Sequence, residues 1–508
     1  MRWTTLAVIA AVACGGAKNT AAPEDSGVIT PDADKTAPTA EEEATFQRMR
    51  AELEATIAKK GIPGASIAVV LRGKLAFSAG VGVKRKGGDA PVGPDTLFRV
   101  ASMSKPIVAA GIMQLAEAGT LDVTHSLRDY VPAFRRAAGF DPRAVHLDHL
   151  LAHTAGLPDT DPKRCSTDPS YLTTWATARA GDPYWSPPGA LFNYSNENYA
   201  FAALALQQLT GTPFHVYLKE HVLIPAGMAT ATFDPAEASD DRTDGLLVAG
   251  MAVPQPIDFA SYDCAVSRSF MGVVASAKDY AHLAEKLIAR GSDIVTPESL
   301  AAMEAPHAPL GTSDKESMGL GLFNVEWRGR MTHHHGGRAY GWESWFAYQP
   351  KDGFAVVVLV NADAWSPDEF GYQVIDAFHR ESGFSLPDWT TSADGWKPYV
   401  GSYNDPYGSL GHMDVTWTAG RMYAHFPDLG KVYELYQYAG DSFAMYIGDS
   451  PFSGTFFADK AGTYRYFATR RGVAVRTAGT AAAAFAPPDA PPESAPLPKR
   501  ASRPFSAW

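Results

Sequence analysis

The sequence is short of cysteine, of positive charge and of long apolar runs. It has three cysteines in 508 residues, and 55 Asp and Glu outnumber 44 Lys and Arg, which gives a formal net charge of −11. A chain this acidic lacks the basic surface that nucleic acid or an anionic membrane would attract, so both are excluded as direct partners. No segment reaches the run of about 20 apolar residues that a membrane-spanning helix requires.

The sequence also lacks the short motifs of several common sites. Neither a Gly-rich phosphate loop nor a dinucleotide fingerprint occurs where a strand would meet a helix. His149 and His153 have the i, i+4 spacing of a zinc-binding helix but not its Glu, and we expect His153 to be a hydrogen-bonded structural residue. We therefore expect no cofactor and no metal ion.

The first 40 residues have the pattern of an export signal followed by a tether. Arg2 precedes a short apolar stretch, LAVIAAVA, and small residues lead into Cys14. The stretch AVAC resembles a bacterial lipoprotein box, in which Cys14 would be lipidated; cleavage after AVA by ordinary signal peptidase is the alternative. Residues 15–40 are rich in Ala, Pro, Asp and Thr, which is typical of a flexible linker. We expect an exported protein, periplasmic or at the cell surface, that touches a membrane only through this lipid.

Two further cysteines, Cys165 and Cys264, remain. In an oxidising compartment they could form a disulfide, and closing so long a loop would stabilise the fold by up to about 4–5 kcal/mol. Nothing in the sequence shows that they meet, and two separate buried thiols are the preferred interpretation.

The patterns along the chain predict two folded domains. Helical periodicity ends at Gly61, and GASIAVVLRGKLAFSAGVG predicts two strands joined by an Arg-Gly turn. A mostly helical section, 120–290, separates them from strands in LGLFNVEWRG, RMTHHHGG, ESWFAYQP and GFAVVVLVNAD, and a helix over 367–381 follows. Because the two groups of strands must share a sheet, residues 41–385 are expected to form one mixed α/β domain with a helical insertion.

The last part of the chain has a different composition. Residues 390–478 are aromatic-rich, with short alternating runs and Gly or Asp turns, as in MDVTWTAGRMYAHF, and predict a small antiparallel β-barrel. Residues 479–508 are rich in Ala and Pro, and we expect them to be disordered.

Ser102 and Lys105 lie at the start of a predicted amphipathic helix, FRVASMSKPIVAAGIMQL, and share one of its faces. A lysine kept neutral by burial can take the proton of a serine hydroxyl, and free N–H groups at a helix start lie where an oxyanion would form. The alternative is a Ser N-cap with an ordinary surface lysine. Pro106 conflicts with this helix start, because it disfavours helical geometry at Lys105.

Three more stretches follow in order: LLAHTAGLP at 150–158, FNYSNENYAFAALALQQLTGTPF at 192–214 and HVLIPAGMATATF at 221–233. Together with FRVASMSKP they resemble the β-lactamase-related serine hydrolases, a family that includes class C β-lactamases, D-alanyl-D-alanine carboxypeptidases, D-aminopeptidases and family VIII esterases. The resemblance covers residues 45–380. It implies a β-lactamase/transpeptidase-like α/β (α+β) fold, with an antiparallel sheet flanked by helices and an all-helical subdomain.

The resemblance also implies roles for single residues. Ser102 would be the acylated nucleophile and Lys105 its general base. In the Y-x-N motif, Tyr194 would pass a proton to the leaving group, and Asn196 would hold Lys105 and the substrate by hydrogen bonds. Taken alone, YSN is as easily explained as a loop that caps a helix beginning near Glu197.

The third family motif, K-T-G or H-x-G, falls in THHHGGRAYGW. His335 fits the family spacing without a gap, whereas His334 would need one extra residue, so we choose His335. Gly337 would leave room for a substrate lying along the strand. The backbone N–H of Arg338 would form an oxyanion hole with that of Ser102.

The three adjacent histidines have further consequences. Strand alternation places His333 and His335 on one face and His334 on the other, so we expect no metal site made of all three. With an ordinary pKa near 6.5, His335 would make activity depend on pH near neutrality. His335 also replaces the permanent cation of K-T-G enzymes. This replacement favours a carboxypeptidase, aminopeptidase or esterase over an efficient β-lactamase.

The sequence thus predicts a serine hydrolase with an acyl-enzyme on Ser102, acting on an ester, a D-amino-acid peptide or a related amide. A non-catalytic peptidoglycan- or peptide-binding protein on the same scaffold is the alternative. The stretch YVGSYNDPYGSL resembles the lipocalin-like barrel appended to some of these hydrolases. This barrel would either pack beside the active-site mouth or be purely structural.

Overall fold

The structure is a computed structural model. It describes residues 37–477 apart from 137–139, 160–164, 250, 291–292, 312–314, 381–396, 406–409, 419, 448–449, 460 and 470–471. The predicted export signal with Cys14, most of the tether and the C-terminal tail lie outside the described residues. Among the helices that are described, none combines the length and apolar character needed to cross a membrane.

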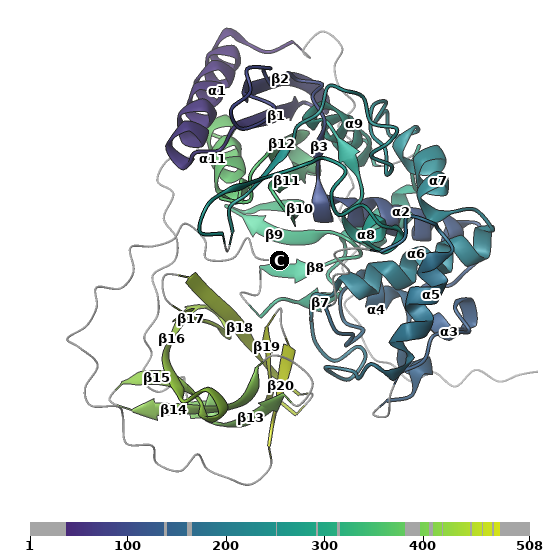
Figure 1. Ribbon diagram of the computed structural model, residues 1–508, viewed down its shortest axis with the longest axis vertical. Coiled ribbons are helices and arrows are strands. Elements are labelled where there is room, and N and C mark those ends of the chain that lie inside the picture. Colours follow the sequence, from purple (N-terminus) through teal and green to yellow (C-terminus); the bar gives the residue numbers. More distant parts are fainter. Residues whose placement is uncertain are drawn as a thin grey trace, which may run out of the picture.

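An antiparallel sheet of eight strands forms the centre of the larger domain, in the order β2-β1-β12-β11-β10-β9-β8-β7 (Figure 1). The strands are β1 (Gly64–Leu71), β2 (Lys74–Gly82), β7 (Ala308–Pro309), β8 (Glu316–Met318), β9 (Phe323–Trp327), β10 (Arg330–Ala339), β11 (Trp342–Gln349) and β12 (Phe354–Val360). The early strands rejoin the late ones through β1 and β12, from Ala65 opposite Val360 to Val70 opposite Ala355. The antiparallel sheet is confirmed, and the short edge strands β7 and β8 were not predicted.

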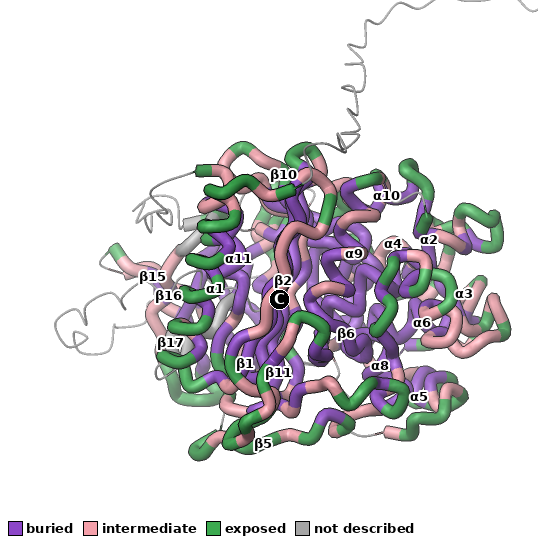
Figure 2. The backbone as a smooth tube through the Cα atoms, turned by 90° about the horizontal axis from the view of Figure 1, so that it is seen from above, coloured by how far each residue is buried: buried purple, intermediate pink, exposed green. Residues whose placement is uncertain are grey.

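Helices cover both faces of this sheet because its central strands are apolar on both sides. In β12, Val356 and Val358 pack in the core beneath α1 (Ala40–Lys60) and α11 (Asp368–Phe378), whereas Val357 belongs to the core on the opposite face. That opposite core includes α2 (Ser104–Glu117), α6 (Asn196–Thr210) and α9 (Ala277–Ile288). Figure 2 shows the buried residues gathered between the sheet and these helices.

The helical insertion lies beside one end of the sheet (Figure 1). Besides α6 and α9 it contains α3 (Leu127–Tyr130), α4 (Leu147–Leu151), α5 (Tyr171–Ala178), α7 (Phe214–Leu218) and α8 (Ala265–Met271), and α10 (Pro297–Glu304) follows it. Two small ribbons accompany them, β3 (Phe98–Arg99) with β6 (Val274–Ala275), and β4 (Gly245–Leu247) with β5 (Gln255–Ile257). The β3–β6 ribbon places the start of α2 next to the end of α8.

The C-terminal unit is a closed eight-stranded antiparallel barrel, as predicted. Its strands are β13 (Gly401–Asp405), β14 (Gly411–Thr418), β15 (Arg421–Phe426), β16 (Lys431–Ala439), β17 (Ser442–Ile447), β18 (Ser450–Ala458), β19 (Tyr464–Thr469) and β20 (Gly472–Arg476). Large side chains fill its interior, among them Tyr403, Phe443, Phe456 and Phe467, each no more than 2% exposed. Their packing makes the barrel interior a core.

Cys165 and Cys264 form a disulfide, with Cα atoms 5.1 Å apart. The prediction of two separate thiols is therefore wrong. The partners are 99 residues apart in sequence, and no local pattern reports that the chain brings them together.

Candidate active site

Ser102 lies in a tight turn between β3 and α2. It is the middle residue of a 3₁₀ helix, Ala101–Met103, and Ala101 has a φ of 48°. A residue with a side chain rarely adopts this left-handed conformation unless its surroundings impose it. Here the Ser344 hydroxyl donates a 2.7 Å hydrogen bond to the carbonyl of Val100, and the Val100 N–H donates to the carbonyl of Val273 at 3.1 Å. The turn is thereby fixed to β11 and to the residue that precedes β6.

Lys105 is completely buried, and its ammonium group points at Ser102. Nζ donates to Ser102 Oγ at 2.9 Å, to Asn196 Oδ1 at 2.9 Å and to the Phe270 carbonyl at 3.2 Å. This geometry excludes the alternative of an ordinary surface lysine. Pro106 does not break the helix, because it lies in the first turn of α2, where backbone N–H groups have no intrahelical partner.

His153 fixes the segment from Asn193 to Asn196 by hydrogen bonds and ring stacking. The Asn193 N–H donates to the His153 carbonyl at 2.7 Å, and the Ser195 N–H donates to His153 Nδ1 at 3.2 Å. The Tyr194 ring stacks on the imidazole at 4.2 Å between centroids, and Lys105 Nζ lies 4.9 Å from the Tyr194 ring centre. His153 is thus the hydrogen-bonded structural residue that was expected, and α6 begins at Asn196, close to the predicted start.

His335 is fully buried on β10, on the same strand face as His333. Its Nδ1 lies 2.6 Å from the Gly336 carbonyl, so Nδ1 carries the proton. Nε2 is buried and has no hydrogen-bond partner among the described residues. Burial, and then the charge of Lys105, lower the pKa of His335 to about 3. The expectation that it titrates near neutrality is wrong, because sequence gives the residue type but not its desolvation.

The other two histidines are used differently. His333 Nδ1 lies 2.8 Å from Asn324 Oδ1, and burial lowers the pKa of His333 to about 4. His334 is half-buried on the opposite face, where its ring lies 5.9 Å from that of Trp345. The alternation predicted for the three residues is present, and His335 is the one that lies near Lys105.

Gly337 is where β10 touches the Ser102 turn. A Cβ atom on Gly337 would come within 2.3 Å of the Val100 carbonyl oxygen, 2.5 Å of Ser344 Oγ and 2.9 Å of the Ser102 nitrogen. The nucleophile turn itself thus requires the missing side chain, and the expected room for a substrate along the strand stays a prediction.

Arg338 lies next to Gly337, near the C-terminal end of β10. Its side chain, half exposed, forms an ion pair with Glu343 on β11 at 2.7 Å, and burial raises the pKa of the Glu343 carboxyl to about 7. Strand β9 pairs with β10 only as far as His334. From 335 to 339, one edge of β10 therefore lacks a pairing strand among the described residues, and within this stretch Gly337 lies next to the Ser102 turn.

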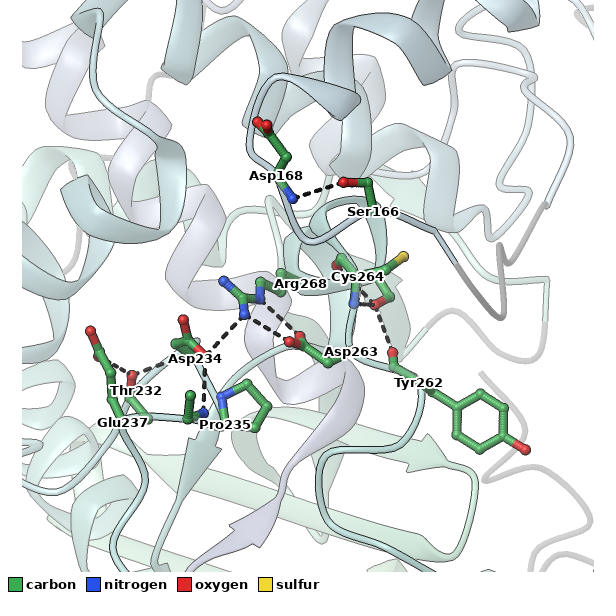
Figure 3. Close-up of polar contacts among 12 residues, drawn as sticks. Ser166, Asp168, Thr232, Asp234, Pro235, Glu237, Tyr262, Asp263, Cys264 and Arg268 are labelled. Carbon is green, nitrogen blue, oxygen red and sulfur yellow. Dashed lines mark hydrogen bonds and ion pairs between the residues drawn. The ribbon is translucent and has the colours of Figure 1, made fainter.

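Helix α8 supplies the Phe270 carbonyl that binds Lys105. Figure 3 shows the ion pairs that hold Arg268 of this helix. The Arg268 guanidinium forms ion pairs with Asp263 at 2.7 Å and with Asp234 at 3.0 Å. Immediately before the helix, Cys264 is bonded to Cys165. Sequence analysis missed this contribution, since a backbone carbonyl leaves no signature in the residue type.

A buried lysine that bonds a serine hydroxyl, with an amide, a tyrosine and a neutral histidine around it, can activate that serine as a nucleophile. Residues 45–378 match the family model described as Beta-lactamase.

The chain belongs to the beta-lactamase family. This is a family of serine hydrolases. Protein flp of Staphylococcus aureus (strain MW2) is 30% identical over 189 residues, 37% of this chain. The match spans 38% of the length of that relative.

Two solved structures show the same family fold. That of SurE has a TM-score of 0.66 at 23% identity, covering 86% of this chain and 100% of SurE. A D-stereospecific amidohydrolase from Streptomyces sp. has a TM-score of 0.56 at 22% identity, covering 65% of this chain and 98% of its own. At these identities the likeness concerns the fold.

Proposed function

We propose that the protein hydrolyses esters or amides of D-amino acids and short peptides through an acyl-enzyme on Ser102. The observation that carries this is the 2.9 Å contact between Lys105 Nζ and Ser102 Oγ inside a buried site. The reaction starts from the form in which Lys105 has lost one proton: Ser102 Oγ bonds to the substrate carbonyl carbon as its own proton passes to the neutral Lys105 Nζ. Tyr194 relays this proton from Lys105 to the departing alcohol or amine as the ester or amide bond breaks. Water then attacks the acyl-enzyme, which releases the acid and restores the Ser102 hydroxyl.

The other residues take supporting roles in this proposal. Asn196 holds Lys105 at its Oδ1, and the Phe270 carbonyl holds it from another side. The backbone N–H groups of Ser102 and Arg338 receive the oxyanion. The close approach of Gly337 to the Ser102 nitrogen supports this pairing, because it brings β10 to the turn.

His335 bears on the choice of substrate. With a pKa of about 3 it is neutral at any working pH, so it can accept a hydrogen bond at Nε2 but adds no positive charge. A substrate carboxylate gains no ion pair from it. A neutral ester or amide is therefore a better substrate than a β-lactam that relies on its carboxylate. The D-stereospecific amidohydrolase with the same fold supports the inclusion of D-amides.

The open edge of β10 offers a place for such a substrate. An extended peptide can pair with residues 335–339, which would bring its carbonyl carbon beside Ser102. We also propose that the protein works outside the cytoplasm, with Cys14 lipidated. The Cys165–Cys264 disulfide supports this, because disulfides persist mainly in oxidising compartments.

Mass spectrometry of the intact protein tests the function. The wild-type chain is incubated separately with a fluorophosphonate, p-nitrophenyl esters, D-amino-acid p-nitroanilides and a penicillin. We expect a covalent adduct with the fluorophosphonate on Ser102, turnover of the esters or anilides, and slow turnover of the penicillin. Ser102→Ala is the control and should give neither adduct nor turnover. A wild-type protein that binds D-peptides but never becomes acylated would instead be the non-catalytic binding protein.

A further inference from the structure

The C-terminal barrel is joined to the hydrolase domain at Gly311. The Asp441 N–H donates to the Gly311 carbonyl at 2.9 Å, and the Ser442 hydroxyl donates to the same oxygen at 3.2 Å. Gly311 has a φ of 74°, and a Cβ atom there would lie 2.2 Å from Thr455 Cγ2. The two domains are in such close contact at this point that no side chain fits between them.

The barrel residues at this junction are themselves held in place. Asp441 lies between β16 and β17, and Asp441 Oδ1 accepts hydrogen bonds from Tyr399 at 2.6 Å and from Tyr464 at 2.8 Å. The Ser442 and Thr455 hydroxyl oxygens lie 2.7 Å apart and are buried. The barrel interior is filled by its own aromatic side chains. Any effect of the barrel on the hydrolase domain therefore has to pass through the outer surface of the barrel at this junction.

Phe457 on β18 extends the junction to the active site. It packs against a cluster that contains Tyr194, together with Phe192, Ala308, Leu310, Met318 and Phe323. It also packs against a second cluster, in which Leu191 meets the barrel residues Ala468 and Val473. In Figure 1, β18, β19 and β20 face β7, while β14 and β15 lie on the far side of the barrel.

Tyr194 thus has two sets of neighbours. His153 stacks on it from within the hydrolase domain, and Tyr194 also belongs to the apolar cluster against which Phe457 packs. Without Phe457 the cluster would lose apolar contact on the barrel side, and the segment from Leu191 to Tyr194 would gain freedom to shift. A shift of about 1 Å in a group that transfers protons can cost about 100-fold in rate.

We propose that Phe457 is a positioning residue, through which the C-terminal barrel fixes Tyr194 for proton transfer. The inference rests on the proposed function and adds a part of the catalytic apparatus that lies in another domain. It predicts that damage to the junction lowers kcat and leaves KM nearly unchanged, since Ser102, Lys105 and the edge of β10 remain in place.

Kinetics of the full-length protein test this proposal. Phe457→Ala should lower kcat for a p-nitrophenyl ester about 10- to 100-fold, while Phe457→Leu, which keeps an apolar side chain there, should recover most of it. Tyr423→Ala is the matched control: it removes an aromatic side chain from β15, on the far side of the barrel, and should leave kcat unchanged. Gly311→Val opens the junction from the hydrolase side and should reproduce the Phe457→Ala result even if that variant folds poorly.

Two further measurements separate positioning from general damage. In a Tyr194→Phe background, Phe457→Ala should cost less than about 2-fold, because the group it positions is already gone. Hydrogen exchange should rise at residues 191–196 in Phe457→Ala and not in Tyr423→Ala. Unchanged kcat in both junction variants, or a full additional loss in the Tyr194→Phe background, would overturn the proposal. If the wild-type chain is never acylated, the proposed function fails instead, and unchanged exchange at 191–196 would then overturn the positioning role independently.

Discussion

The buried neutral state of His335 should be measurable as a pH dependence of stability. Its pKa in the folded protein is about 3, against an ordinary value near 6.5 in the unfolded chain. Between these pH values the unfolded state binds a proton that the folded state does not, so the free energy of unfolding falls as the pH drops below about 6.5. Each pH unit corresponds to about 1.4 kcal/mol, which gives about 2 kcal/mol between pH 6.5 and pH 5.

The perturbation that isolates this effect is His335→Asn. The Asn side chain does not titrate, and its amide can still donate to the Gly336 carbonyl as Nδ1 does now. Urea unfolding of both proteins at pH 7.5 and pH 5.0 gives the comparison, and wild type should lose about 2 kcal/mol more than the variant on acidification. His334→Asn removes the neighbouring half-buried imidazole and serves as the control. If wild type and His335→Asn lose equal stability, His335 is not held neutral by burial and the reasoning is refuted.

The remaining predictions concern the turn, the disulfide and the lipid anchor. Gly337→Ala should lower the melting temperature, by an amount equivalent to about 1–3 kcal/mol, and kcat by about 100-fold, because its Cβ would meet the Val100 carbonyl at 2.3 Å. Gly336→Ala, whose Cβ has no neighbour nearer than 3.5 Å, should change neither, and equal effects would count against the explanation. Cys165→Ser should reduce stability by about 2–5 kcal/mol in thermal melting, and a reductant should do the same to wild type but not to the variant. Cys14→Ser should release the full-length protein from bacterial membranes on fractionation, whereas processed wild type found wholly soluble and without lipid would disprove the anchor.

The parts of the fold that could be predicted are those with a local pattern. The turn between the first two strands has Arg72 and Gly73 at φ values of 51° and 73°, the conformation that short hairpins favour and that RG between apolar runs suggests. Helix α1 starts at a Thr39 capping box and ends at Gly61 with a φ of 68°, both of which are visible as residue types. The edge strands β7 and β8 are two and three residues long, too short for any periodicity to reveal.

The candidate site divides in the same way. Ser102, Lys105, Tyr194 and Asn196 stand in motifs whose spacing is readable, and the structure brings them together. Asp159, whose Oδ1 accepts the Asn196 N–H at 2.9 Å, directly follows the LLAHTAGLP motif, so reading one residue further would have found it. The Phe270 carbonyl, the disulfide and the pKa of His335 arise only from three-dimensional proximity and desolvation, which no single stretch encodes.

The pairing of β1 with β12 has a consequence for how the chain reaches its native state. These two strands lie side by side as the second and third strands of the sheet, yet β1 ends at Leu71 and β12 begins only at Phe354. A topology with such high contact order folds slowly, because the β1–β12 contacts form only after the long intervening chain has been brought together. During synthesis, β1 has no partner on its β12 side, and its entirely buried residues stay uncovered. Nascent chains that stall before β12 should therefore aggregate through this edge and require a chaperone that holds them open.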